Sequence, residues 1–98
     1  MSYVKTNNER GTNMARIIDG DKMNLIGESL KKHRQAQKLS QQMLSNKLEL
    51  LGVYVCRGSI SRIEDGSRTV TDIELYAISK VLGVDISELF GAVSLGDD

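Results

Sequence analysis

The sequence predicts an all-α fold, a compact globule of five short helices with a flexible arm before it. Three observations support this fold class. Apolar residues recur at helical spacing from about residue 25 onward. Residues that favour helix starts or helix ends flank these periodic stretches. The apolar run at residues 53–55 is too short to imply a sheet, and we interpret it as an extended connector.

Two helices are expected before Gly52. Asn24 is a suitable N-cap for the first helix, which runs from about residue 25 to residue 38. Ser40 is a suitable N-cap for the second helix, which Gly52 ends. Apolar residues at helical spacing in the second helix are Met43, Leu44, Leu48 and Leu51. We expect Met43 to lie in the core.

Three further helices are expected between residues 56 and 91. The third runs from about residue 56 to residue 65, and Ile60 and Ile63 mark its buried side. The fourth and fifth begin with capping boxes, in which a glutamate lies three residues after the N-cap. These boxes are Thr71 with Glu74 and Asp85 with Glu88. The apolar face of the fourth helix is formed by Ile73, Ala77, Ile78, Val81 and Leu82.

The chain divides into three parts on this basis. Residues 1–23 are rich in Asn, Thr, Gly and charge with little periodicity, so we expect a flexible N-terminal arm. Residues 24–91 form the helical domain, and residues 92–98 form a loose C-terminal tail. The length of 98 residues fits this single domain.

Charge is distributed unevenly along the chain, although the formal net charge is zero. Residues 22–47 hold six basic side chains and one acid, whereas residues 72–98 hold six acids and one base. A molecule polarised in this way can present one face to phosphates. Ordinary solvated faces are the alternative interpretation of the same pattern.

Several functional classes are disfavoured by composition. No apolar run approaches the roughly 20 residues of a membrane span, and the polar N-terminus lacks a secretory pattern, so we expect a cytoplasmic protein. One cysteine, Cys56, and one histidine, His33, leave no disulfide and little for a metal site. We interpret Cys56 as a buried or half-buried packing thiol. With no Gly-rich phosphate loop either, we expect no enzyme activity, no metal and no cofactor.

The most informative segment is the third expected helix. Between Arg57 and Arg62 only Ile60 is apolar, which is a narrow stripe for a helix used only in packing. A helix in the DNA major groove needs such a seam together with outward side chains that donate hydrogen bonds. Gly58 permits close approach of the backbone. The segment therefore predicts a helix-turn-helix that binds DNA.

Three motifs carry a resemblance to a known family. LSQQML at 39–44, SISRIEDG at 59–66 and LGVDISELF at 82–90 together resemble the phage-repressor (Cro/C1, XRE) family of helix-turn-helix regulators. The resemblance covers about residues 26–90. It implies a five-helix lambda-repressor-like domain whose recognition helix, about residues 56–65, enters the major groove of double-stranded DNA. It also implies a sequence-specific transcriptional regulator, a repressor, that binds DNA as a homodimer.

The resemblance assigns roles to individual residues. The implied contacts to DNA bases come from Arg57, Ser59, Ser61 and Arg62, with a phosphate contact as the alternative for Ser59. The implied contacts to DNA phosphates come from Ser40, Gln41 and Arg68. Arg34 and Glu64 correspond to a pair that links the first and third helices, and two independent solvated charges are the alternative.

The chain also departs from compact family members. Several additional residues between Lys47 and Cys56 lengthen the second helix and the connector, and Gly58 stands where a base-reading side chain is common. These departures bear on the angle between the two helices and on base contact at position 58. A second function is also kept open. It is an antitoxin-type protein-interaction module with attached DNA binding, in which the arm or the tail folds around a protein partner.

Overall fold

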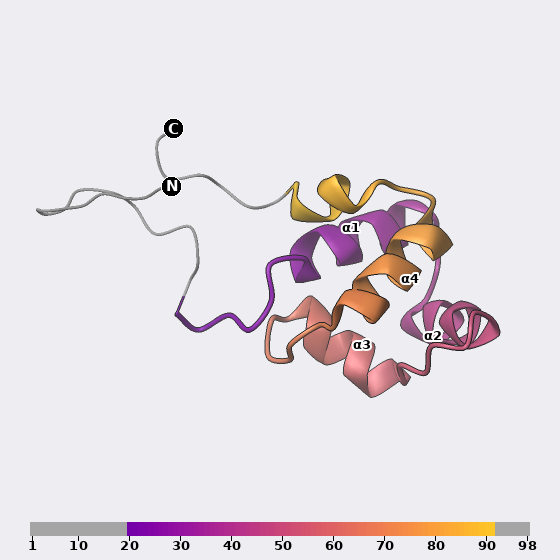
Figure 1. The fold of residues 1–98 in the computed structure, drawn as a ribbon, viewed down its shortest axis with the longest axis horizontal. Helices are drawn as coiled ribbons and strands as arrows, with labels where there is room; N and C mark the ends of the chain where they lie inside the picture. The colour runs from indigo at the N-terminus through magenta and orange to yellow at the C-terminus, as the bar shows by residue number, and fades with distance from the viewer. Residues whose placement is uncertain (1–19, 92–98) are drawn as a thin grey trace, which may run out of the picture.

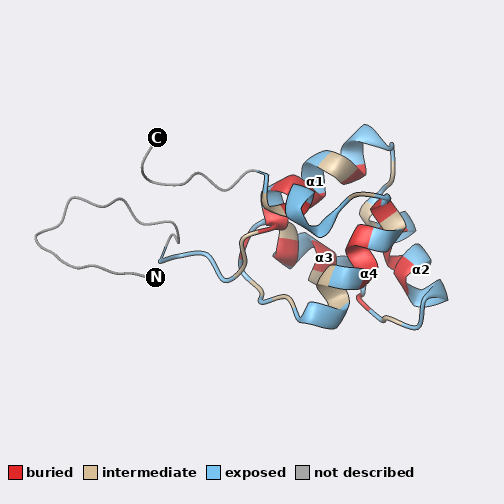
Figure 2. Cartoon of the chain, turned by 45° about the horizontal axis from the view of Figure 1, so that its top comes forward, coloured by how far each residue is buried: buried red, intermediate tan, exposed pale blue. Residues whose placement is uncertain are grey.

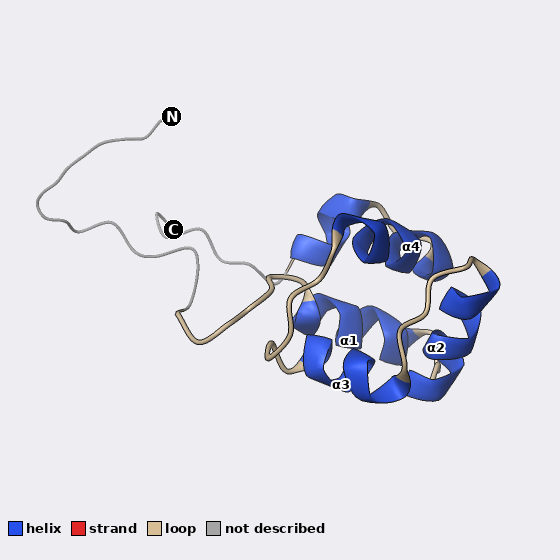
Figure 3. Ribbon diagram, turned by 60° about the horizontal axis from the view of Figure 1, so that its bottom comes forward, coloured by secondary structure: helices blue, strands red, loops and turns tan. Residues whose placement is uncertain are grey.

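The computed structural model describes residues 20–91, so the predicted tail at 92–98 and all but the last four residues of the predicted arm at 1–23 lie outside the described residues. The described chain forms four α-helices and one 3-10 helix (Figure 1). In order they are α1 (Gly27–Ala36), α2 (Gln41–Leu50), α3 (Arg57–Glu64), α4 (Asp72–Leu82) and η1 (Ile86–Phe90). No strand occurs between residues 20 and 91 (Figure 3). The predicted all-α class is confirmed, with a 3-10 helix as its fifth element.

The helices enclose one aliphatic core, and their exposed surfaces point outward (Figure 2). Every helix contributes to it, and η1 closes one side by packing on α1 and α4. The fully enclosed side chains are Leu30, Leu44, Leu48, Ile60, Ile63, Ile78 and Leu89. Burial of one such side chain stabilises the fold by about 1.5–3 kcal/mol. None of the helices described is long and apolar enough to cross a membrane.

Local capping explains where α2 and α4 begin. The Ser40 hydroxyl accepts a hydrogen bond from the Met43 amide at 3.0 Å, as the sequence predicts. At α4 the Thr71 hydroxyl accepts from the Glu74 amide at 3.1 Å, and the Glu74 carboxylate accepts from the Thr71 amide at 3.1 Å. Both halves of the predicted capping box are present.

The bounds of α1 differ from the prediction. The helix begins at Gly27 with Ile26 as its N-cap, so Asn24 is not the N-cap residue. The Asn24 carboxamide oxygen instead accepts from the Ile26 and Gly27 amides at 3.0 and 2.8 Å. The helix ends at Ala36, because Lys38 turns into the left-handed region at φ 60° and cannot continue it.

The prediction that Met43 lies in the core is wrong, because its side chain is 46% exposed. The buried stripe of α2 is formed by Leu44 and Leu48, one turn apart, and Met43 lies about 100° around the helix from Leu44. Ile73 is also exposed, at 66%, because it lies on the opposite side of α4 from Leu82.

Candidate nucleic-acid interface

The longer connector between α2 and α3 is held against the domain. Gly52 ends α2 in the left-handed conformation, at φ +83°, and the Val53 amide donates to the Leu48 carbonyl at 3.1 Å. Val55 is 2% exposed and belongs to the core. The additional residues therefore leave α3 packed against both α2 and α1. In Figure 3 the connector crosses from the end of α2 to the start of α3.

The helix α3 has one apolar side and one open polar side. Ile60 and Ile63 are fully buried. At about 100° per residue, the centre of the opposite side carries Gly58 and Arg62, one turn apart. Both are exposed, as are Arg57 and Ser61, while Ser59 is partly buried. The four residues assigned to base contacts thus all lie outside the core, on a surface that a ligand can reach.

An ion pair fixes α3 to α1. Arg34 donates to the Glu64 carboxylate from Nε at 2.6 Å and from Nη2 at 3.0 Å, in a bidentate arrangement. The two side chains are only 9% and 4% exposed, so they are not independent solvated charges. The remaining guanidinium nitrogen, Nη1, donates to the Leu39 carbonyl at 2.7 Å, which satisfies the buried cation.

Gln41 joins this ion pair from the start of α2. Its amide nitrogen donates to Glu64 Oε1 at 3.0 Å, so α1, α2 and α3 converge on one carboxylate. Gln41 is partly exposed, and Ser40 beside it is exposed. The amides of the first turn of a helix lack intrahelical acceptors and suit an anion. Two of the three residues assigned to phosphate contacts, Ser40 and Gln41, therefore lie at a helix N-terminus that Glu64 holds in place.

Two contacts at the far end of α3 were missed by the sequence analysis. The Asn24 amide nitrogen donates to the Ile63 and Arg68 carbonyls at 3.0 and 2.8 Å. Gly27 packs so closely on α3 that an added Cβ would overlap the Ile63 carbonyl and lie 2.9 Å from the Glu64 carbonyl. A glycine inside a helical pattern was the available signal for this close approach.

The segment before α1 also belongs to the domain. The Met23 amide donates to the Gly66 carbonyl at 2.8 Å, and the Lys22 ammonium donates to the Asp65 carbonyl at 3.4 Å. Both residues fall within the range that the sequence assigns to the arm. Their contacts tie the chain entering α1 to the turn that follows α3.

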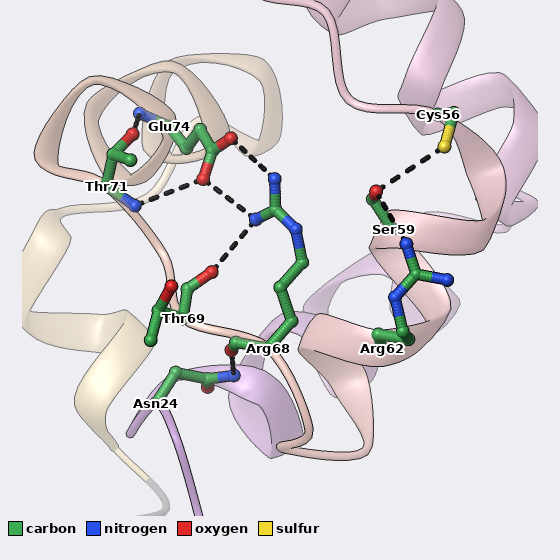
Figure 4. Close-up of polar contacts among 8 residues, drawn as sticks. All are labelled: Asn24, Cys56, Ser59, Arg62, Arg68, Thr69, Thr71 and Glu74. Atoms are coloured by element: carbon green, nitrogen blue, oxygen red, sulfur yellow. Dashed lines mark hydrogen bonds and ion pairs between the residues drawn. The ribbon is translucent and has the colours of Figure 1, made fainter.

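Arg68 is already paired within the domain (Figure 4). Its guanidinium donates to both oxygens of Glu74 at 2.9 Å and to the Thr69 carbonyl at 2.9 Å. The two paired side chains are 27% and 13% exposed. Hydrogen bonding to Glu74 raises the pKa of Arg68, and hydrogen bonding to Arg68 lowers the pKa of Glu74. This pair fastens the loop after α3 to the capping box of α4, so Arg68 is not a free cation here.

Cys56, Ser59 and Arg62 form a chain of contacts along the exposed side of α3 (Figure 4). The Cys56 thiol donates to Ser59 Oγ at 3.4 Å, and Arg62 Nη2 donates to the same oxygen at 3.2 Å. The expectation of a packing thiol is wrong, because Cys56 is the exposed N-cap of α3. Hydrogen bonding to the Ser59 hydroxyl, then to the Ser59 amide, lowers the pKa of Cys56.

The described part of the chain contains no cluster of possible metal-ligating side chains. Between residues 20 and 91, no three His, Cys, Asp or Glu side chains are grouped as a metal ion would require. The distinctive surface is thus the polar side of α3, with the start of α2 beside it. A short polar helix fixed against a preceding helix is the arrangement of helix-turn-helix DNA-binding proteins.

Comparisons with known proteins agree with this class. The helix-turn-helix family model HTH_3 matches residues 30–89. The chain therefore belongs to the helix-turn-helix family, of the Cro/C1 (XRE) type that its motifs resemble. It is a DNA-binding protein of the class that regulates transcription. No curated protein sequence matches the chain at a significant level.

Two solved structures share its fold. One is the restriction-modification controller protein C.AhdI from Aeromonas hydrophila, at 28% identity and a TM-score of 0.58. That match covers 66% of this chain and 87% of the controller protein. The other is the DNA-binding domain of BldD, at 24% identity and a TM-score of 0.58, covering 74% of this chain and 97% of that domain.

Proposed function

We propose that this protein is a sequence-specific repressor that places α3 in the major groove of double-stranded DNA. The observation that carries the proposal is the exposed polar side of α3, held rigidly from behind by the Arg34–Glu64–Gln41 network. A recognition helix must keep its position when its outward side chains bind bases, because a loosely held helix would pay an entropic cost on binding. The likeness to a restriction-modification controller protein supports a regulatory role.

Arg57 and Arg62 are the proposed principal base readers. An arginine in the major groove can donate two hydrogen bonds to the O6 and N7 atoms of guanine, which discriminates by about 1–3 kcal/mol. Between residues 20 and 91 the Arg57 guanidinium has no hydrogen bond or ion pair, so binding would break no internal contact of that group. Ser59 and Ser61 lie beside the arginines and complete the proposed base-contacting set, in which Ser59 can act on a base directly or through the Arg62 guanidinium that it contacts.

Phosphate contacts are proposed at the start of α2. The Ser40 hydroxyl accepts from the Met43 amide but keeps its own proton to donate. Gln41 uses one amide proton on Glu64 and keeps a second for a phosphate oxygen. Arg68 is the third proposed phosphate contact, and it can serve only by exchanging part of its Glu74 pairing for the phosphate.

Binding as a homodimer on DNA is part of the proposal. One recognition helix of eight residues reads few base pairs, so a single copy offers limited specificity. Two copies related by a two-fold axis would read half-sites about 34–36 Å apart, one helical turn of DNA. Occupation of such a site within a promoter represses transcription by excluding polymerase, and such a regulator acts in the cytoplasm.

A selection experiment tests the proposal. Purified protein is incubated with sheared DNA from its source at two salt concentrations, and the bound fragments are sequenced. We expect a two-fold symmetric motif that disappears in the Arg57→Ala/Arg62→Ala double variant. Lys80→Ala is a control, because it removes an exposed cation from α4 and should leave the motif unchanged. Recovery of no DNA at either salt concentration would contradict DNA binding itself.

The second candidate is the antitoxin-type interaction module. The observation that favours it is a run of exposed apolar side chains at the end of α2 and in the connector. Leu50 is 86% exposed, Leu51 54% and Tyr54 77%. Exposed apolar patches are common where proteins bind partners. Salt-sensitive binding without a motif, together with a soluble complex on co-expression with a neighbouring toxin-like gene product, would favour this candidate over the repressor.

A further inference from the structure

The guanidinium of Arg62 is held over the first turn of α3 before any ligand is bound. Side chains on a helix lean toward its N-terminus, so a long side chain at position 62 reaches back along the helix. Its Nη2 donates to Ser59 Oγ at 3.2 Å. Its Nη1 lies 3.6 Å from the point where a Cβ at position 58 would stand. The group thus lies over Gly58, at the centre of the exposed side of α3.

Gly58 provides the space for this placement. A Cβ at this position would already be in contact with Nη1, so the glycine leaves the outward space at position 58 to the Arg62 guanidinium. The outward position that a side chain at residue 58 would fill is therefore filled by the side chain of Arg62, one turn further along α3. In Figure 4 the Arg62 side chain runs back to Ser59, on the same side as Cys56.

We infer that Ser59 is a positioning residue that aims Arg62 at one guanine, and that Arg62 supplies the base contact missing at Gly58. This inference rests on the proposed function and deepens it, because it names the residue that sets specificity and the base that it selects. With Nη2 bound to Ser59, the other edge of the guanidinium remains available to the guanine O6 and N7 atoms. A guanidinium already held in place loses less conformational entropy on binding than a free one does.

The test is selection from a library of duplexes with a randomised central segment, using four proteins. They are the wild type, Arg62→Lys, Ser59→Ala and Ser59→Thr. Lysine keeps the charge but cannot donate in a bidentate manner, so Arg62→Lys identifies the guanine position that depends on Arg62. Discrimination at that position should fall by about five- to a hundred-fold. Far-UV circular dichroism and thermal melting verify that each variant is folded.

Ser59→Ala should weaken the preference at that same guanine by about two- to ten-fold, because the acceptor for Nη2 is lost. Ser59→Thr keeps the hydroxyl and should therefore keep the wild-type preference for that guanine. The dependence of affinity on salt should stay the same in both serine variants, because no phosphate contact changes. Replacing that guanine with 7-deazaguanine, which lacks the N7 acceptor, should cost the wild type more affinity than it costs Ser59→Ala.

Three results would overturn the inference. If Ser59→Ala keeps the full guanine preference, Ser59 does not position Arg62. If Ser59→Ala instead loses preference at a position that Arg62→Lys leaves intact, Ser59 reads a base of its own. If the wild type selects no motif at all, the proposed function fails first and the inference fails with it, so the two failures are distinguishable.

Discussion

Replacing Glu64 with glutamine should destabilise the domain strongly, because it leaves a buried cation without its counter-charge. The Arg34 side chain is 9% exposed, and the Leu39 carbonyl is its other acceptor within the described residues. Breaking a buried pair by removing one partner costs about 3–5 kcal/mol. Glu64→Gln keeps the side-chain volume and one acceptor oxygen, so we expect the lower end of that range. The midpoint of thermal unfolding should fall by about 12–24 °C for a domain of this size.

A double-mutant cycle measures the interaction free energy of Arg34 and Glu64 separately from the contacts that each makes with other groups. Arg34→Met, Glu64→Gln and the double variant are unfolded in urea and followed by far-UV circular dichroism. The double variant should be less destabilised than the sum of the single variants, with a coupling free energy of about 2 kcal/mol or more. Arg57→Met is the control, because an exposed position should change stability by less than about 0.5 kcal/mol. Additive single effects would refute the claim that this pair holds α3 against α1.

The structure supports three further predictions. Gly27→Ala should cost about 1–3 kcal/mol through overlap with backbone carbonyls of α3. Gly58→Ala should instead stabilise the fold by about 0.5–1 kcal/mol, because its Cβ would make only an ordinary contact with the Arg62 side chain. Urea unfolding that ranks the two variants equally would contradict the close approach of Gly27 to α3. Hydrogen bonding to Arg68 lowers the pKa of Glu74 from its ordinary value of 4.5. The contribution of the pair to stability is therefore fully present above pH 4.5, and it is lost as the pH falls through the lower pKa of Glu74 in the folded state. Glu74→Gln should therefore cost about 1–3 kcal/mol at pH 7 and flatten the loss of stability in acid, and an unchanged pH profile from pH 3 to 7 would argue against the pair. Because the Ser59 hydroxyl lowers the pKa of the exposed Cys56 thiol, iodoacetamide at pH 7.5 should alkylate the native protein faster than the urea-unfolded protein. Ser59→Ala should slow this alkylation, and a native rate no higher than the unfolded rate would show that the thiol is not activated.

Much of the fold was already specified by local features of the sequence. The Ser40 cap, the Thr71–Glu74 box and the glycine after α2 act within a few residues of chain, so their spacing alone predicts them. The polar side of α3 is likewise visible as a stretch with one apolar residue in six. The resemblance to the family adds the expected link between Arg34 and Glu64, and these two side chains do form an ion pair in the structure.

Tertiary structure decided which groups the individual side chains contact. Arg68 could equally have pointed to solvent, but the turn after α3 places it against Glu74 in a bidentate pair. Asn24 bonds carbonyls more than thirty residues away, and Gly27 meets the backbone of α3. Helical periodicity predicts which face is apolar but not how much of it a neighbour covers, which is why Met43 is exposed.

The division between the two sources of information has one physical cause. Caps, turns and amphipathic spacing depend on energies set by residues within about one helical turn, so the sequence by itself determined the helices and the polar face that suits DNA. Ion pairs between helices and close backbone approaches depend on where separate segments of the chain meet in space. Those placements follow from packing of the whole core, and only the folded structure could decide them.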